Sequence, residues 1–176
     1  MGGIVNVFIL DLDVTKCAQF HCDKHVVKMI LETAQIMSTA LTSMGVKHNG
    51  YRSTHPNHPC CVWARNLSHL LYLRSLGRAL GIEYHVRYGK RHKSLEVIEG
   101  LPIPEMTVAV PHQWALAMPT EYHQYSIQQL RDSQGRMTKQ RELTLDVVKS
   151  YRAYYRSKKG KFDMKWTNRN VPSWFN

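Results

Sequence analysis

Hydrophobic side chains recur along most of the chain with the period of an α-helix. After Asp13, a residue type that caps helices, the pattern predicts a helix that continues to about Met44 and stops at Gly45. A second long helix is predicted to begin near Pro59, which suits a first helical turn, and to end at Gly89. Three shorter helices are expected at residues 93–99, 121–131 and 143–158.

Other segments lack this period. The apolar run at residues 5–10 predicts one short strand. Residues 100–120 hold four of the seven prolines and predict a long ordered loop or a lid. Gly77 and Gly81 mark either a close helix crossing or a break. We therefore expect a single, compact, mainly α-helical domain over residues 1–176, with a short N-terminal strand and an irregular, basic and aromatic C-terminal tail.

The first predicted helix carries an ordered line of polar side chains. On a helical wheel these lie within about 40° of one another. They are His21, His25, Lys28, Glu32, Gln35 and Thr39. The opposite sector is apolar and wide enough to face a core, except for Asp23, which should pair with an arginine, a histidine or a helix end. The alternative is an ordinary solvated helix face with one ion pair.

The same line of side chains suggests chemistry. A lysine between a histidine and a glutamate has groups that can accept and donate protons on both sides. An amine that loses water contact near other cations becomes a nucleophile, and Lys24 or Lys28 could supply it. The candidate catalytic residues are His21, Asp23, Lys24, His25, Lys28 and Glu32. As a reaction pocket, this face would have to be closed partly by residues 87–93.

Charge points to an anionic partner. The chain has 24 Lys and Arg against 13 Asp and Glu, a net charge of +11. Twelve basic and four acidic residues lie between Arg131 and Asn170, so the excess is concentrated in the last quarter. The simplest partner is nucleic acid, and we expect DNA. No apolar run is long enough for a membrane span, and no secretory or myristoylation signal is evident at the N-terminus, so we expect an intracellular protein.

Two basic clusters could contact phosphates, "EYHVRYGKRHKS" and "SYRAYYRSKKGKF". In the second, aromatic residues alternate with cations, which suits base stacking combined with phosphate neutralisation. The candidate nucleic-acid-binding residues are Arg65, Arg87, Lys90, Arg91, His92, Lys93, Arg152, Arg156, Lys158, Lys159, Lys161, Trp166 and Arg169. The structural alternative is that cations near a helix end stabilise its dipole, and that the aromatic residues of the tail fix it to the core.

Histidines and cysteines raise the possibility of a metal site. His21 and His25 are one helical turn apart, and residues 55–61 add two histidines and two cysteines, but without the paired spacing of a zinc site. Four cysteines, two of them adjacent, fit no disulfide framework. We expect reduced thiols, no bound metal and no cofactor.

Several motifs resemble those of a family of small, mostly uncharacterised proteins of tailed phages and other viruses. They are "FHCDKHVVKMILETAQ", "THPNHPCCVWAR", "EYHVRYGKRHKS", "AMPTEY", "YRAYY" and "W.NR.VPSWF". A more distant similarity is to pyrimidine-dimer DNA glycosylases of the endonuclease V type, which are basic, all-helical proteins with an aromatic-rich C-terminal tail. That resemblance implies a glycosylase with lyase activity, in which an amine attacks the sugar C1′ and a glutamate assists. Glu32 is the candidate glutamate, whereas "MGGIVN" lacks the N-terminal threonine whose amine that family uses.

The sequence therefore favours a DNA-acting protein of phage type, a base-excision or base-processing enzyme that takes a flipped nucleotide. Two alternatives remain open. One is a transferase that modifies bases in viral DNA, and the other is a non-catalytic nucleic-acid-binding protein. For a viral protein, the expected location is the cytoplasm of the host cell.

Overall fold

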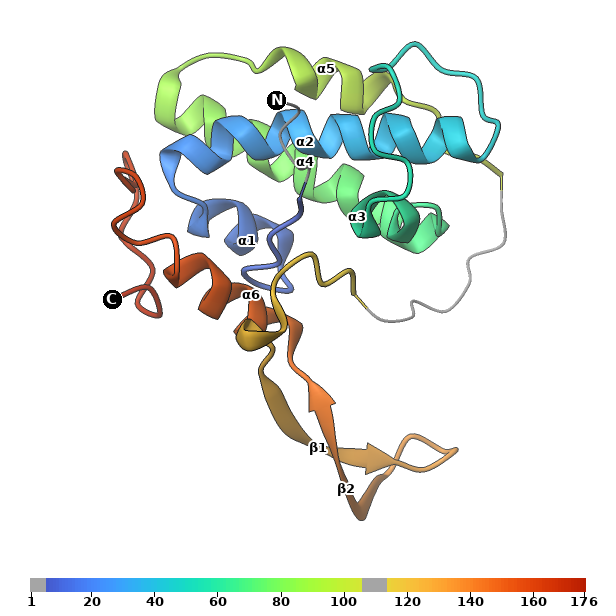
Figure 1. Cartoon of the computed structure of the whole chain (residues 1–176), viewed down its shortest axis with the longest axis vertical. Coiled ribbons are helices and arrows are strands. Elements are labelled where there is room, and N and C mark those ends of the chain that lie inside the picture. The colour runs from blue at the N-terminus through green and yellow to red at the C-terminus, as the bar shows by residue number, and fades with distance from the viewer. Residues whose placement is uncertain (1–5, 106–113) are drawn as a thin grey trace.

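The computed structural model describes residues 6–105 and 114–176. Nearly half of this part of the chain is helical and there is one small two-stranded sheet, which agrees with the expected mainly α class (Figure 1). The helices are α1 (Val14–Phe20), α2 (Asp23–Ser43), α3 (Pro59–Trp63), α4 (Leu67–Tyr88), α5 (Lys93–Gly100) and α6 (Val147–Arg156), and a 3₁₀ turn, η1, spans Thr120–Tyr122. Within the described ranges no helix is both long and apolar enough to cross a membrane.

The first predicted helix is interrupted at His21 and Cys22. Asp13 caps α1 as expected, because its side chain accepts hydrogen bonds from two backbone amides of the first turn. The chain then turns to an extended conformation at His21, whose Nδ1 bonds back to the Cys17 carbonyl at 2.7 Å. The Cys22 amide donates to the Tyr155 hydroxyl, 2.9 Å away. These tertiary partners replace helical hydrogen bonds, and α2 starts afresh at Asp23.

The second predicted helix is divided as well. Pro59 lies in the first turn of α3, as its position suggested, but this helix ends after one turn. Asn66 then caps α4, because its side-chain oxygen accepts the Ser68 amide at 2.9 Å. At its other end α4 stops at Gly89, whose φ of +65° is the left-handed conformation that glycine adopts readily. Both predicted ends are confirmed, and the internal break is new.

Gly77 and Gly81 mark a close helix crossing and not a break, since α4 runs through both. A Cβ atom on Gly77 would lie 2.7 Å from Cδ1 of Ile98 on α5, and one on Gly81 would lie 2.7 Å from Cδ2 of Leu95. The absence of side chains therefore lets α4 and α5 pack closely. Helix α2 lies beside α4 and also contacts α3 and α5 (Figure 1).

A β-hairpin replaces the helix predicted at residues 121–131. Strand β1 (Tyr125–Arg131) pairs antiparallel with β2 (Met137–Leu145), with Ile127 opposite Leu143. The turn between them includes Gly135, with a φ of +77°. The hairpin extends away from the helices (Figure 1). The helix predicted at 143–158 is therefore wrong over its first residues, which belong to β2, and its later part is α6.

The predicted N-terminal strand is also wrong over its described part. Residues 6–10 form no strand, although residues 7–10 are buried. In the described part of the chain no second strand pairs with this segment, so side chains supply the hydrogen bonds of its backbone. The Arg152 Nε donates to the Leu10 carbonyl at 2.8 Å, and the Cys17 thiol lies 3.3 Å from both the Phe8 carbonyl and the Leu10 amide. Residue 5 lies outside the described residues, as does part of the predicted 100–120 loop.

Candidate active site

A pocket of about 340 Å³ forms where the N-terminal segment, α2 and the end of α6 meet. This is within the range of volumes that small-molecule and nucleobase sites occupy. Its lining residues are Asn6, Phe8, His25, Lys28, Met29, Glu32, Ala117, Tyr154 and Lys158. Three of the six predicted catalytic residues therefore meet in one cavity, together with a lysine predicted to bind nucleic acid.

Glu32 is the buried acid of this pocket, with 4% of its surface exposed. Its Oε1 lies 3.1 Å from the Lys28 ammonium, and its Oε2 accepts the backbone amide of Asn6 at 2.8 Å. Burial raises the pKa of Glu32, while the Asn6 hydrogen bond and Lys28 act in the opposite direction. The result is a carboxylate that holds a proton more strongly than one in water, a property suited to a general base.

His25 supplies a neutral hydrogen-bond donor. Its Nδ1 is 2.8 Å from the Tyr155 hydroxyl, which already accepts the Cys22 amide. The buried hydroxyl has one proton, and its available acceptor is Nδ1, so the proton of His25 resides on Nε2. Burial lowers the pKa of His25 to about 3, helped by the nearby His21, Lys158 and Lys28. Tyr155 therefore fixes the tautomer of a histidine that stays uncharged at neutral pH.

Lys158 brings an amine into the pocket from just beyond α6. Its Nζ lies 4.2 Å from the centre of the Tyr154 ring and 5.4 Å from that of Phe8. No residue of the described chain forms a hydrogen bond or ion pair with this ammonium. Burial lowers the pKa of Lys158, and the neighbouring cations Lys161 and Lys28 lower it further, against the opposing effect of Glu32. An amine with a lowered pKa is deprotonated for more of the time, and the deprotonated amine is the nucleophile.

The remaining predicted catalytic residues lie outside the pocket. His21 is fully buried in the core, where burial lowers its pKa to about 4 and its ring packs edge-on against Phe8 and Tyr155. Lys24 is exposed, with its ammonium 5.4 Å from the Phe162 ring centre. The N-terminal segment and α6 cover His25 and Glu32, so the solvated-face alternative is wrong for these two residues, whereas Lys28 between them is exposed.

Asp23 belongs to an internal ion-pair network. It accepts Arg87 at 2.9 Å, which confirms the expected pairing with an arginine, although the Asp23 side chain retains 17% exposure. The Arg87 side chain is fully buried and also donates to Glu83 at 2.7 Å. Arg169 donates to the same Glu83 carboxylate. Arg87 and Arg169, predicted to contact nucleic acid, are therefore occupied by internal carboxylates.

Six other predicted nucleic-acid contacts also have structural partners. Arg152 donates to the Leu10 carbonyl and pairs with Asp11, and Trp166 is buried with its Nε1 donating to the Phe20 carbonyl. The His92 side chain caps α5, and Arg65 donates to the Pro56 carbonyl. Arg91 pairs with Glu96 and Glu99, and Arg156 donates to the Trp174 carbonyl, although both arginines are exposed. The remaining predicted cations are the exposed Lys90, Lys93, Lys159 and Lys161 and the half-buried Lys158. In the tail, Trp166 and Phe175 are buried, whereas most of the cations are exposed.

The pocket is closed by different residues from those expected. The 87–93 segment does not line it, whereas Asn6, Phe8, Ala117 and Tyr154 do. Sequence reasoning missed all four. Phe8 lay in an apolar run and Tyr154 in an aromatic cluster, but nothing local in the sequence joins two segments so far apart. The ring of Phe8 stacks on His25 with centroids 5.2 Å apart.

His58 and the four cysteines occupy structural positions. All four cysteines are buried free thiols, which agrees with the expected reduced state. His58 caps α3 by accepting the Cys60 amide. Residues 6–105 and 114–176 contain no group of three or more potential ligands arranged to hold a metal ion.

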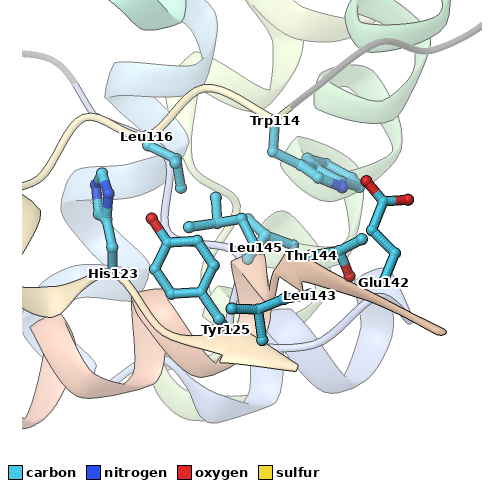
Figure 2. Close-up of a pocket in the computed structure, with 9 residues that line it drawn as sticks. Trp114, Leu116, His123, Tyr125, Glu142, Leu143, Thr144 and Leu145 are labelled. Carbon is cyan, nitrogen blue, oxygen red and sulfur yellow. The ribbon is translucent and has the colours of Figure 1, made fainter. Parts of the chain in front are cut away.

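A second, mostly apolar hollow of about 520 Å³ lies at the base of the hairpin. Figure 2 shows Trp114 and Leu116 of the preceding loop on one side and Tyr125, Leu143 and Leu145 of the strands on the other. It lacks the buried acid and amine found beside α2, so the pocket at Glu32 is the stronger candidate for catalysis.

No protein-family model, curated protein or solved structure matches this chain. The function is therefore argued from the geometry of the Glu32 pocket and from the charge of the surface.

Proposed function

We propose that this protein is a base-processing enzyme of DNA that consists of one helical domain. Specifically, we propose a glycosylase with lyase activity that takes a flipped nucleotide into the Glu32 pocket. One observation carries the proposal. A buried carboxylate, a half-buried amine and a neutral imidazole converge in a cavity of about 340 Å³ in a strongly basic chain. Flipping would deliver the nucleotide from the duplex to such a cavity.

Each group has a role. The uncharged Lys158 amine attacks C1′, the bond from C1′ to the base breaks, and the base leaves with one of the two protons of the attacking nitrogen. The Nε2–H of His25 donates a hydrogen bond to the departing base. The bond from C1′ to the ring oxygen then breaks, that oxygen takes the remaining proton of the nitrogen, and an imine forms between Lys158 and C1′. Glu32 then takes a proton from C2′, a C2′–C3′ double bond forms, and the 3′ phosphate leaves with the C3′–O electron pair.

Borohydride trapping tests this directly. The protein is incubated with duplexes that contain an abasic site or a pyrimidine dimer, and hydride reduces any imine to a stable crosslink. We expect wild type and Lys47→Met to be trapped and Lys158→Met not to be. Lys47 is the control because it is an exposed lysine that does not line the Glu32 pocket. Peptide mass mapping should place the crosslink on Lys158.

Other outcomes of the trapping experiment would support a different nucleophile or one of the alternative functions. A crosslink that persists in Lys158→Met and maps to another amine would retain the lyase but reject this nucleophile. Nucleosides of altered mass without a crosslink would indicate a transferase that modifies bases. Tight duplex binding with neither product would indicate a non-catalytic nucleic-acid-binding protein.

A further inference from the structure

The β1–β2 hairpin has no evident role in the helical core. Its strands pair mainly with each other and extend away from the helices (Figure 1). Ile127 and Leu143, opposite each other on one face, are 69% and 65% exposed. A two-stranded hairpin alone is only marginally stable in water, so a protruding one with exposed apolar residues is better suited to contact with a partner.

The side chains of the hairpin indicate the chemistry of that partner. Between Tyr125 and Leu145 there are four glutamines, three arginines and one lysine against two acidic residues. One of the acids, Asp132, already pairs with Arg136 at 2.8 Å. Gln128, Lys139 and Arg141 are exposed, and within the described chain their side chains form no hydrogen bond or ion pair. Arginine and glutamine are the side chains that form paired hydrogen bonds with guanine and adenine edges.

The apolar and polar residues share one face. Side chains directly opposite each other in an antiparallel pair point to the same side. The Ile127–Leu143 pair is therefore followed on that side by Arg141 and by Gln129, whose side-chain nitrogen donates to the Thr138 carbonyl. Apolar groups beside an unpaired arginine suit the floor of a DNA groove, where thymine methyl groups lie next to base edges. A second copy of this chain would instead bring a matching set of cations to the interface.

We infer that the β1–β2 hairpin is an arm that enters the major groove of duplex DNA beside the nucleotide held in the Glu32 pocket. A two-stranded ribbon fits that groove. Helix α6 links the two sites, since β2 leads into its first turn and Lys158 follows its last. Ten helical residues span about 15 Å, the rise of about four base pairs. The inference rests on the proposed DNA-acting function and extends the bound surface along the duplex.

Matched triple variants test the arm. Arg131→Ala/Lys139→Ala/Arg141→Ala removes three cations of the arm, and Lys47→Ala/Arg52→Ala/Arg78→Ala removes three exposed cations elsewhere. We expect the arm variant to bind a 30-base-pair duplex with an abasic site roughly tenfold more weakly or worse, with a shallower salt dependence, and the control variant to bind nearly as wild type. Far-ultraviolet circular dichroism of both variants should match that of wild type.

Guanine N7 methylation locates the arm on the duplex, because N7 lies in the major groove. Wild type should protect guanines about four or more base pairs to one side of the abasic site, and the arm variant should not protect them. Equal affinity and unchanged protection in the two triple variants would overturn the inference. A dimer in sedimentation that Ile127→Ser/Leu143→Ser dissociates, without a decrease in DNA affinity, would assign the face to a second copy. Borohydride trapping on an abasic single strand is a separate readout, so the lyase proposal can fail or stand independently of the arm.

Discussion

Glu32 shows how far the fold determines the chemistry of one residue. In the sequence it is half of an ordinary i,i+4 pair with Lys28, and in the structure that pair exists, with Nζ and Oε1 3.1 Å apart. What the sequence does not reveal is that Asn6, Phe8 and Lys158 cover the carboxylate from distant parts of the chain. The residue was predictable as a candidate, whereas its burial and its raised pKa depend on tertiary structure.

Glu32→Gln should slow turnover strongly and leave folding intact. Glutamine keeps an oxygen to accept the Asn6 amide but cannot take a proton, so we expect kcat to fall by about 10² to 10⁴. Single-turnover kinetics on the abasic duplex, with duplex affinity and melting temperature measured in parallel, check this. Glu96→Gln, a change at an exposed site, is the control. Turnover within a few fold of wild type would remove Glu32 from the mechanism.

His21 should make stability depend on pH. Burial holds its folded pKa near 4, against 6.5 for a histidine in water, so between these limits the unfolded chain binds the extra proton. The contribution of His21 to the free energy of unfolding is therefore fully present above about pH 6.5. It falls as the pH decreases, by roughly 1.4 kcal/mol per pH unit. His25 acts in the same direction, while the raised pKa of Glu32 acts against both.

Urea unfolding of His21→Gln between pH 7.5 and 5 measures this contribution. On acidification the unfolding free energy of the variant should fall less steeply than that of wild type, by about 1.4 kcal/mol per pH unit. His85→Gln, at an exposed position on α4, should retain the wild-type slope. Equal slopes for all three proteins would show that His21 takes up its proton in the folded state as easily as in the unfolded one.

Among the elements, the helices with clear end signals were predictable and the hairpin was not. Asp13, Pro59 and Gly89 act locally, so their helix ends follow from neighbouring residues. The break at residues 21–22 depends on Tyr155, which is remote in sequence. In β2, Leu143 and Leu145 alternate with polar residues, a pattern typical of a strand, and the Gly135 turn precedes it. Residues that follow β2 have helical spacing, and for that reason the sequence predicted a helix over residues 143–158 that included the end of the strand.

The irregular tail is held by the same network that contains Asp23. Thr167 donates both its amide and its hydroxyl to Asp23, which also pairs with the buried Arg87. Asp23→Ala removes all three interactions and leaves Arg87 with one carboxylate fewer, so we expect the unfolding free energy to fall by about 3 kcal/mol. Urea denaturation measures it.

The exposed Asp163–Lys165 pair provides the comparison, because both of its side chains face solvent. Asp163→Ala should change the unfolding midpoint little. A destabilisation in Asp23→Ala no greater than in this control would mean that the tail and Arg87 do not depend on Asp23.

At the scale of the whole molecule, the positive charge should govern affinity for DNA. Lys159 and Lys161 are exposed cations of the tail close to Lys158. Lys159→Glu/Lys161→Glu should weaken duplex binding and flatten the plot of log K against log salt by about 0.9 for each phosphate that the tail no longer neutralises. Fluorescence anisotropy at several salt concentrations checks this, with Lys47→Glu/Arg52→Glu as an equal charge change elsewhere. Identical slopes for the two variants would show that the cations of the tail do not neutralise DNA phosphates.

The position of the pocket between the first and last parts of the chain has a consequence for synthesis. His25 and Tyr155 are 130 residues apart, and the pocket also needs Phe8 and Lys158. Interactions between such distant segments form late in folding, because the intervening chain must first close. On the ribosome, Glu32 and His25 emerge long before α6. A nascent or prematurely ended chain therefore carries the acid without the amine or the tyrosine that orients the histidine, and only the nearly finished polypeptide could cut DNA by the proposed route.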